Sequence, residues 1–173
     1  LKTSEEIEDL KSIIDYVEQI DFVDKNKIGV AGHSLGGLVS IITASQDFRI
    51  KVLVTLAAVD DPKEKSIVWV KDMEKWKQIG YHIFSNIKYI KIKIGYGFWT
   101  DLKKFSNSTN IKKVKVPLLI LHGDKDKVVP LSHGEKIYKN ANEPKLLRII
   151  EGANHLFSGK AILALTVKYA VDW

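Results

Sequence analysis

Apolar residues alternate between helical and extended spacing along most of this chain. Thr3 with Glu6 resembles a capping box at the start of a predicted helix at about 4–19, whose apolar stripe comprises Ile7, Leu10, Ile14 and Val17. Apolar runs predict strands at about 27–31, 51–57, 116–121 and 145–150, and helical patterns predict helices at about 34–45, 131–142 and 159–171. Strands joined through helices are typical of the α/β class, with a mostly parallel sheet flanked by helices and right-handed crossovers.

This alternation of strands and helices breaks down between residues 60 and 110. The stretch is rich in aromatic residues, among them Trp69, Trp76, Phe98 and Trp99. Isoleucine alternates with lysine from Ile90 to Ile94, which predicts a strand with lysine on one face. We therefore expect one domain over residues 1–173 that carries an insert at about 60–110.

Composition and charge narrow the class of protein. The 173 residues are 45% hydrophobic, which suits a single domain with a substantial core. The sequence has no run of eighteen apolar residues and no signal-peptide pattern, so we expect no membrane span. The net charge of +6 comes almost wholly from lysine. Because phosphate and base recognition favours arginine, we expect a solvated lysine surface and no nucleic-acid partner.

Cysteine is absent from the chain, which excludes disulfides, thiol nucleophiles and cysteine-ligated zinc. The sequence also has neither a Walker glycine loop nor an H-E-x-x-H motif. We therefore expect no metal and no organic cofactor. The lack of cysteine is compatible with a reducing cytoplasm, which is the location we expect.

A glycine-rich hexapeptide, Gly32-His33-Ser34-Leu35-Gly36-Gly37, follows the apolar run 28–31. A G-x-S-x-G between a strand and a helix is typical of a nucleophile elbow, in which glycines relieve crowding around a strained serine. Because a helix starts directly after Ser34, the backbone N–H of Leu35 is the expected donor to an oxyanion. The alternative is an ordinary strand-to-helix loop with an N-capping serine.

Two later segments supply an acid and a base in the chain order Ser, Asp, His. A buried strand is predicted before the polar stretch Gly123 to Asp126, and two aspartates there compete for the role of the acid. With its elbow and this order, the chain resembles the α/β-hydrolase superfamily of the serine esterase and lipase type. The frequent family pattern H-G-x-x-D-x-x-V-P matches His122 to Pro130, which implies that Asp126 is the acid and that Asp124 caps a turn.

The same resemblance implies that His155 is the base, because Gly152 and His155 reproduce a family loop of a glycine, two further residues and a histidine. A general base must lie within reach of the nucleophile and be oriented by a carboxylate, and among the histidines only the position of His155 meets these demands. We expect structural or solvated roles for the other four, His33, His82, His122 and His133.

In the family, an insert at the place of residues 60–110 forms a lid over the catalytic pocket. The candidates for contact with the substrate are Trp69, Trp76, Phe98 and Trp99. The alternative is that these aromatic residues form a small core of the insert itself. A partly β lid is also similar to that of cinnamoyl and feruloyl esterases.

The resemblance further implies strands ahead of the first helix, whereas only 33 residues precede Ser34 here. The family loop that supplies the second oxyanion N–H has no counterpart. We expect an α/β-hydrolase fold that lacks its N-terminal strands. An N-terminal segment or a homodimer contact would then cover the edge of the strand that begins at Ile28.

These features predict a serine hydrolase that cleaves small or aromatic carboxylic esters through an acyl-Ser34 intermediate, with a small-molecule ester as its partner. The triad also suits a thioesterase, a lipase or a serine peptidase. Another alternative is a weakly active or non-catalytic remnant of the fold that acts as a binding module.

Overall fold

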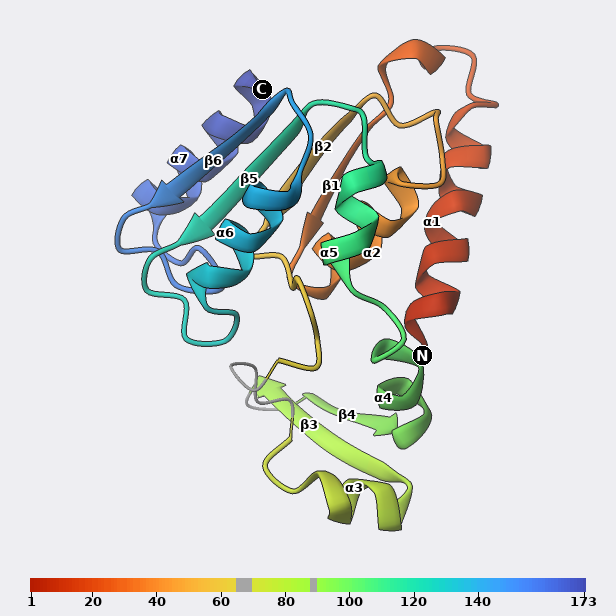
Figure 1. Ribbon diagram of the computed structural model, residues 1–173, viewed down its shortest axis with the longest axis vertical. Coiled ribbons are helices and arrows are strands. Elements are labelled where there is room, and N and C mark those ends of the chain that lie inside the picture. Colours follow the sequence, from red (N-terminus) through yellow and green to blue (C-terminus); the bar gives the residue numbers. More distant parts are fainter. Residues whose placement is uncertain (65–69, 88–89) are drawn as a thin grey trace.

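A four-stranded parallel sheet forms the centre of the main body in the computed structural model, which describes residues 1–64, 70–87 and 90–173 (Figure 1). The strand order is β1-β2-β5-β6, and the members are β1 (Gly29–His33), β2 (Val52–Leu56), β5 (Leu118–Gly123) and β6 (Lys145–Ile150). All four predicted strands are present, with bounds that differ by up to two residues. The mostly parallel sheet and the α/β class are therefore confirmed.

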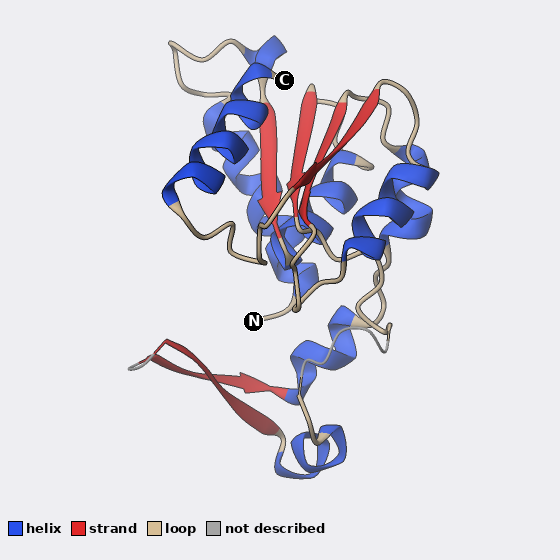
Figure 2. Cartoon of the chain, turned by 90° about the vertical axis from the view of Figure 1, so that its left-hand side faces the viewer, coloured by secondary structure: helices blue, strands red, loops and turns tan. Residues whose placement is uncertain are grey.

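Helices cover both faces of this sheet (Figure 2). The helices of the main body are α1 (Thr3–Val17), α2 (Leu35–Ala44), α6 (Leu131–Asn140) and α7 (Lys160–Asp172), with a short 3-10 turn at Lys25–Lys27. On one face, Ile41 of α2 and Ile137 of α6 form an apolar cluster with Leu53 and Ile120 of the sheet. Residues of α7 cluster with the alternate strand side chains of the other face. The two inner strands, β2 and β5, are thus buried on both faces, as their continuous apolar runs predict.

The start of α1 differs from the predicted capping box. Thr3 is the first helical residue, Lys2 occupies the N-cap position, and no side chain of the helix caps it. The carboxylate of Asp101, which is distant in sequence, accepts the N–H of Ser4 at 2.8 Å. Burial raises the pKa of Asp101, but the hydrogen bonds from Ser4 and Lys104 outweigh burial and hold this pKa below its usual value. The prediction was wrong because a tertiary contact supplies the acceptor that a local side chain was expected to supply.

The described residues of 73–102 lie beyond the carboxyl ends of the strands, at the bottom of Figure 1, whereas residues 107–110 lie beside α2 and α6 of the main body. Their elements are α3 (Met73–Ile79), the antiparallel strands β3 (Tyr81–Ile87) and β4 (Ile90–Gly95), α4 (Tyr96–Leu102) and α5 (Asn107–Asn110), which a 3-10 turn at Ile111–Lys113 follows. The strand predicted from alternating isoleucine and lysine is β4. Trp69 lies outside the described residues.

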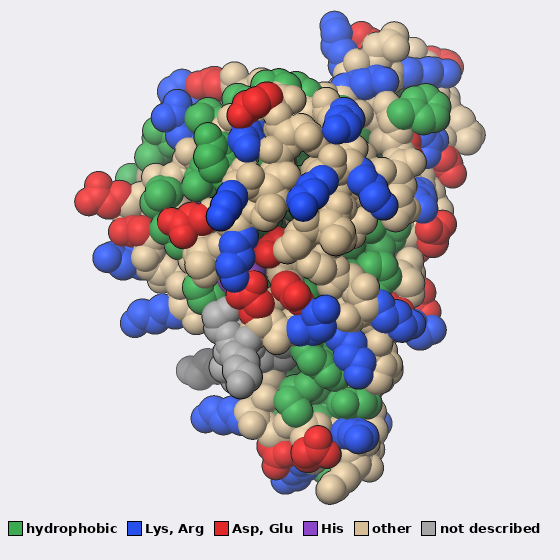
Figure 3. Space-filling model, viewed as in Figure 1, with side chains coloured by type: hydrophobic (Ala, Val, Ile, Leu, Met, Phe, Trp, Pro, Cys, Tyr) green, Lys and Arg blue, Asp and Glu red, His purple; other side chains and the backbone are tan. Residues whose placement is uncertain are grey.

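The 60–110 segment shares an apolar cluster with the main body. Trp76, Phe98 and Leu102 belong to the same buried cluster as Leu38 of α2 and Val129, which follows β5. Lysine and arginine side chains are spread over the face that Figure 3 shows, and acidic side chains lie between them. No helix in the described part of the chain combines the length and apolarity needed to cross a membrane.

Candidate active site

Ser34 lies in the turn between β1 and α2 and has an unusual backbone conformation. Its φ of 56° and ψ of −117° place a residue with a side chain in a region that favours glycine. The N–H of Ser34 donates to the carbonyl of Leu56 at 2.8 Å, and its carbonyl accepts the N–H of Val59 at 3.2 Å. These two bonds to the neighbouring strand end hold the strained turn, as a nucleophile elbow requires.

The turn needs glycine at two positions, Gly32 and Gly37, and only Gly32 belongs to the G-x-S-x-G motif. A Cβ on Gly32 would lie 2.3 Å from the carbonyl oxygen of Gly36, and a Cβ on Gly37 would lie 2.5 Å from the Cβ of Ala58. A Cβ on Gly36 would meet no described atom within 4 Å. Crowding therefore explains Gly32 and Gly37, whereas the expectation that Gly36 relieves crowding was wrong.

The N–H of Leu35 is the first of helix α2 and has no acceptor one turn earlier within that helix. Like the other N–H groups of the first turn, it lies at the positive end of the helix dipole. It directly follows Ser34, so this N–H is suited to stabilise an oxyanion that forms on a carbonyl attacked by the serine.

His155 lies on the loop between β6 and α7, next to Ser34. Its Nε2 is 3.0 Å from the Oγ of Ser34, and its Nδ1 is 2.8 Å from the Oδ2 of Asp126. An ionised carboxylate only accepts hydrogen bonds, so Nδ1 carries the proton and Nε2 is free to accept the serine hydroxyl. The imidazole thus has the tautomer that a general base needs.

Asp126 follows β5, and its carboxylate is fully buried. Besides the bond from His155, its Oδ1 accepts the N–H groups of Val128 at 2.8 Å and Val129 at 2.9 Å. Burial raises the pKa of Asp126, but these hydrogen bonds outweigh burial and hold the pKa below its usual value. The carboxylate is therefore ionised and fixed in direction, and it can stabilise a positive imidazolium.

The other aspartate of this loop has a different place. Asp124 accepts the N–H of Gly152 at 2.6 Å, so it ties the loop after β5 to the loop that carries His155. The structure brings Asp126 rather than Asp124 to the imidazole of His155. Asp124 is thus not the cap of a single turn, as predicted, because its carboxylate accepts a hydrogen bond from another loop.

Two further histidines position these groups. The Nε2–H of the buried His122 donates to the carbonyl of Val129 at 2.9 Å, behind Asp126. The Nε2–H of His33 donates to the backbone carbonyl of His155 at 2.7 Å, and the two histidine rings lie 4.8 Å apart. Burial lowers the pKa of both His33 and His122, which favours their neutral forms beside the base. Sequence reasoning gave His33 no such contact, because 122 residues separate it from its acceptor.

Several hydrogen bonds join the two ends of the 60–110 segment to each other and to the main body. The N–H of Asp60 donates to the Nδ1 of the buried His133 at 3.2 Å. The hydroxyl of Ser108 donates to the carboxylate of Asp60 at 3.0 Å, and the amide of Asn107 donates to the carbonyl of Val59 at 2.7 Å. No spacing in the sequence signals these contacts, which depend on tertiary structure.

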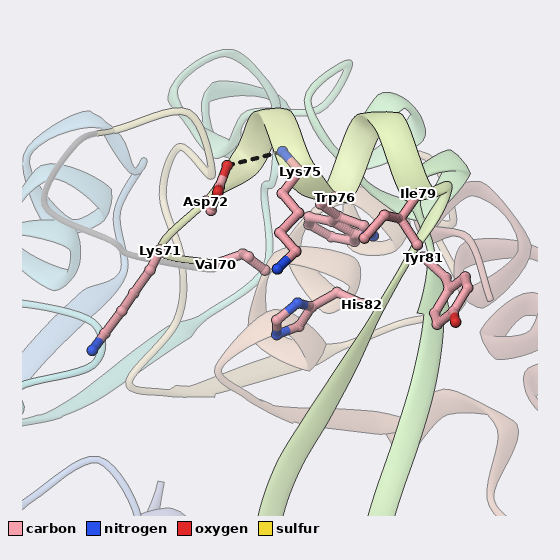
Figure 4. A pocket seen from close by; sticks show the side chains of 8 residues that line it. All are labelled: Val70, Lys71, Asp72, Lys75, Trp76, Ile79, Tyr81 and His82. Carbon is pink, nitrogen blue, oxygen red and sulfur yellow. Dashed lines mark hydrogen bonds between the residues drawn. The ribbon is translucent and has the colours of Figure 1, made fainter.

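The aromatic candidates for substrate contact have separate places. Phe98 is buried in the shared apolar cluster, and the half-buried Trp99 packs against it. Trp76 is buried in the same cluster and also borders a cavity of about 630 Å³ (Figure 4). Phe98 therefore fits the alternative of a core residue, while Trp76 fits both interpretations. Among the described residues, no cluster of histidine, cysteine or carboxylate side chains could hold a metal ion.

Comparisons with known proteins identify relatives of this chain. A family model described as the prolyl oligopeptidase family matches residues 1–173. The protein YfhR of Salmonella typhi is 29% identical over 157 residues, which are 89% of this chain and 49% of that protein. The serine hydrolase BPHL of Homo sapiens is 25% identical over 167 residues, which are 86% of this chain and 54% of that protein. This chain thus spans about half the length of the curated relatives it matches.

Among solved structures, the crystal structure of the esterase domain of a Rhodothermus marinus protein has a TM-score of 0.75 to this chain, at 21% identity. The match covers 96% of this chain and 67% of that one. At this identity the similarity concerns the fold alone. It extends over both the main body and the 60–110 segment.

Proposed function

Because the chain belongs to the prolyl oligopeptidase family, and with it to the α/β-hydrolase superfamily that its motifs resemble, we propose that it is a serine hydrolase that cleaves carboxylic esters. The observation that carries this proposal is the series of contacts from Ser34 through His155 to Asp126, at 3.0 Å and 2.8 Å. A nucleophile, a base and an orienting acid in hydrogen-bond reach of one another are the parts that acyl transfer needs.

In the proposed reaction, the Oγ of Ser34 attacks the ester carbonyl while His155 takes the hydroxyl proton. The tetrahedral oxyanion forms near the N–H of Leu35, and Asp126 stabilises the imidazolium. His155 then gives the proton to the departing alcohol, and an acyl-Ser34 remains. A water molecule, deprotonated by His155, attacks this acyl group, and the acid leaves as the serine recovers its proton. No step needs a metal or an organic cofactor.

A serine peptidase is the second candidate, and the family match favours it. Peptide and ester hydrolysis use the same groups but differ in the leaving group, since an amine needs protonation by His155 more than an alcohol does. Thioesterase and lipase activities would use the same three side chains. If the chain is instead a non-catalytic binding module, Ser34 does not react, although its hydroxyl contacts His155.

The 60–110 segment is proposed to act as the lid of this site, within a single domain over residues 1–173. The place of the described residues of 73–102 beyond the carboxyl ends of the strands supports this role, because ligands of open α/β sheets bind there. Small or aromatic acyl esters are the proposed substrates, and the aromatic character of the segment supports them. A cytoplasmic location stays a prediction.

The outer edge of β1 is proposed to be covered in the whole protein. Within the described residues β1 pairs only with β2, and parallel strands are seldom left open to solvent on one side. An N-terminal segment or a second copy of the chain would meet this edge. Sedimentation of the isolated chain tests for the second copy, since a monomer at all concentrations would exclude it.

Labelling with a fluorophosphonate tests the proposed nucleophile. We expect the probe to label the protein at Ser34, and we expect Ser34→Ala to remove the label while the thermal unfolding midpoint stays the same. Nitrophenyl esters and aminoacyl amides then separate esterase from peptidase activity. A folded protein that neither takes the label nor hydrolyses any of these substrates would overturn the proposal.

A further inference from the structure

The cavity of about 630 Å³ lies between α3 and the start of β3, inside the 60–110 segment (Figure 4). Asp72, Lys75, Trp76 and Ile79 recur three or four positions apart and so share one face of the helix. The other described residues of the lining are Val70 and Lys71 before the helix and Tyr81 and His82 after it. None of the three proposed catalytic side chains borders this cavity, and its volume suits a small ligand.

Aromatic side chains form one wall of the cavity and are held in place. The indole of Trp76 is almost fully buried, and its Nε1–H donates to the carbonyl of Ile94 at 3.2 Å. The ring of His82 lies 6.2 Å from that of Trp76 and 4.8 Å from that of Phe84. A planar ligand ring can pack against such a wall without reordering it, which lowers the entropic cost of binding.

A cation without an acidic partner points into the same space. In Figure 4 the side chain of Lys75 points toward His82, and none of the ion pairs among the described residues includes Lys75. Lys71 points away from the cavity in the same view. Among the described residues of the lining the one carboxylate is that of Asp72, which is the N-cap of α3 and accepts the backbone N–H of Lys75 at 2.8 Å.

We propose that this cavity binds a planar aromatic carboxylate, with its ring against the partly exposed imidazole of His82 and its carboxylate on the ammonium of Lys75. The aromatic wall accounts for the ring, and the unpaired cation accounts for a single negative charge. A phosphate group would favour several donors or an arginine fork, and the described part of the lining has no arginine. The inference goes beyond the proposed esterase, since binding here does not require Ser34.

Calorimetric titration of the Ser34→Ala protein tests the proposal, with 4-hydroxycinnamate and its methyl ester as probes. The serine variant leaves the ester intact and makes the result independent of any activity. We expect the acid to bind more tightly than the ester. Lys75→Gln should weaken binding of the acid by about 5-fold and leave binding of the ester unchanged, because only the acid has a charge for the ammonium.

Lys77→Gln is the matched control, since Lys77 is an exposed lysine of the same helix that does not line the cavity. It removes the same overall charge and should leave both affinities unchanged. His82→Ala should weaken the acid and the ester alike, through loss of the aromatic wall. Equal effects of Lys75→Gln and Lys77→Gln, equal affinities for acid and ester, or no binding of the acid to the folded protein would each overturn the proposal.

Discussion

The side chains of the proposed triad and the 60–110 segment are held in place by different kinds of interaction. Directional hydrogen bonds fix the proposed triad: Asp126 accepts two backbone N–H groups, and the elbow at Ser34 is bonded to the end of β2. The 60–110 segment is held mainly by apolar contacts, in a cluster that Trp76 and Phe98 share with Leu38. Hydrogen bonds fix distances between atoms, whereas apolar packing tolerates many side chains of suitable volume.

This difference indicates that chemistry and recognition can vary separately in such a fold. The polar links of the segment to the main body are concentrated at its two ends, at Asp60 and Asn107. Between these ends lies a unit with its own hairpin and its own cavity. Substitutions within that unit can change what binds while the geometry of Ser34 and His155 stays the same.

The largest effect is expected from Asp126→Asn, which changes the directional hydrogen bond to His155 in the proposed triad. Asparagine has the same shape but can donate to Nδ1 of His155 and so favour the wrong tautomer of the base. We expect kcat for ester hydrolysis to fall by roughly 10³ to 10⁴-fold, with little change in KM. Steady-state kinetics on a nitrophenyl ester measures this loss.

Asp124→Asn is the control for that variant, because Asp124 lies two residues away and touches the loop of His155 only through the N–H of Gly152. The asparagine oxygen can still accept this N–H, so we expect a loss of less than about 10-fold. A greater loss from Asp124→Asn than from Asp126→Asn would reverse the assignment of the acid.

The fold could be predicted from the sequence where the pattern is local. Runs of apolar residues such as 118–121 specify buried strands, and helical spacing specifies the helices between them, so the parallel sheet followed directly. The capping of α1 could not be predicted in this way. Its acceptor is the carboxylate of Asp101, and no local pattern links that residue to Ser4.

The candidate site shows the same division. The proximity of Ser34, Asp126 and His155 could be predicted because the segments that carry them each have a short motif, and the structure brings these three side chains together. Their catalytic roles stay a proposal. Neither the contact of His33 with His155 nor the cavity beside Lys75 corresponds to a sequence motif. They depend on how separate elements pack, and residue spacing within one element contains no information about that packing.

Trp76→Ala tests the apolar part of the comparison. Removing the largest side chain of the shared cluster should lower the free energy of unfolding by about 3–5 kcal/mol, because it leaves a void between the segment and the main body. Urea unfolding followed by circular dichroism measures this change. Hydrogen exchange should show greater loss of protection in α3, β3 and β4 than in the four-stranded sheet.

Trp76→Phe is the milder companion variant, and it should lose less stability because a ring still fills part of the space. If exchange instead rises equally in β5 and β3, the segment and the main body unfold as one unit. The division between the two regions would then not describe their stability.

A smaller effect is expected from His33→Leu, which removes the donor to the carbonyl of His155. The loop that carries the base would lose one anchor, and we expect kcat to fall by about 10-fold with KM unchanged. His33→Gln should restore most of the rate, because an amide N–H can reach a similar place. If glutamine behaves like leucine, the hydrogen bond at 2.7 Å has no part in positioning the base.

The smallest effect concerns how stability depends on pH, through the hydrogen bond from the N–H of Asp60 to His133 that links the two regions. Burial lowers the pKa of His133, and its Nδ1 accepts the N–H of Asp60 only when this nitrogen is unprotonated. As the pH falls below about 6.5, the unfolded chain binds a proton at this histidine that the folded chain does not, so stability is lost. We expect His133 to account for part of the loss between pH 7 and 5.5.

His133→Gln should therefore show a shallower decline in urea-unfolding free energy over this range, whatever its stability at pH 7. Asp126 does not interfere, since its pKa is lowered: its contribution is complete above its unfolded pKa of about 3.9 and is lost only as the pH falls further. His33 and His122 remain in both proteins and contribute the same slope to each. If the free energy of unfolding declines equally with pH in parent and variant, the folded protein takes up the proton at His133 freely. The contact between His133 and Asp60 is then open to water.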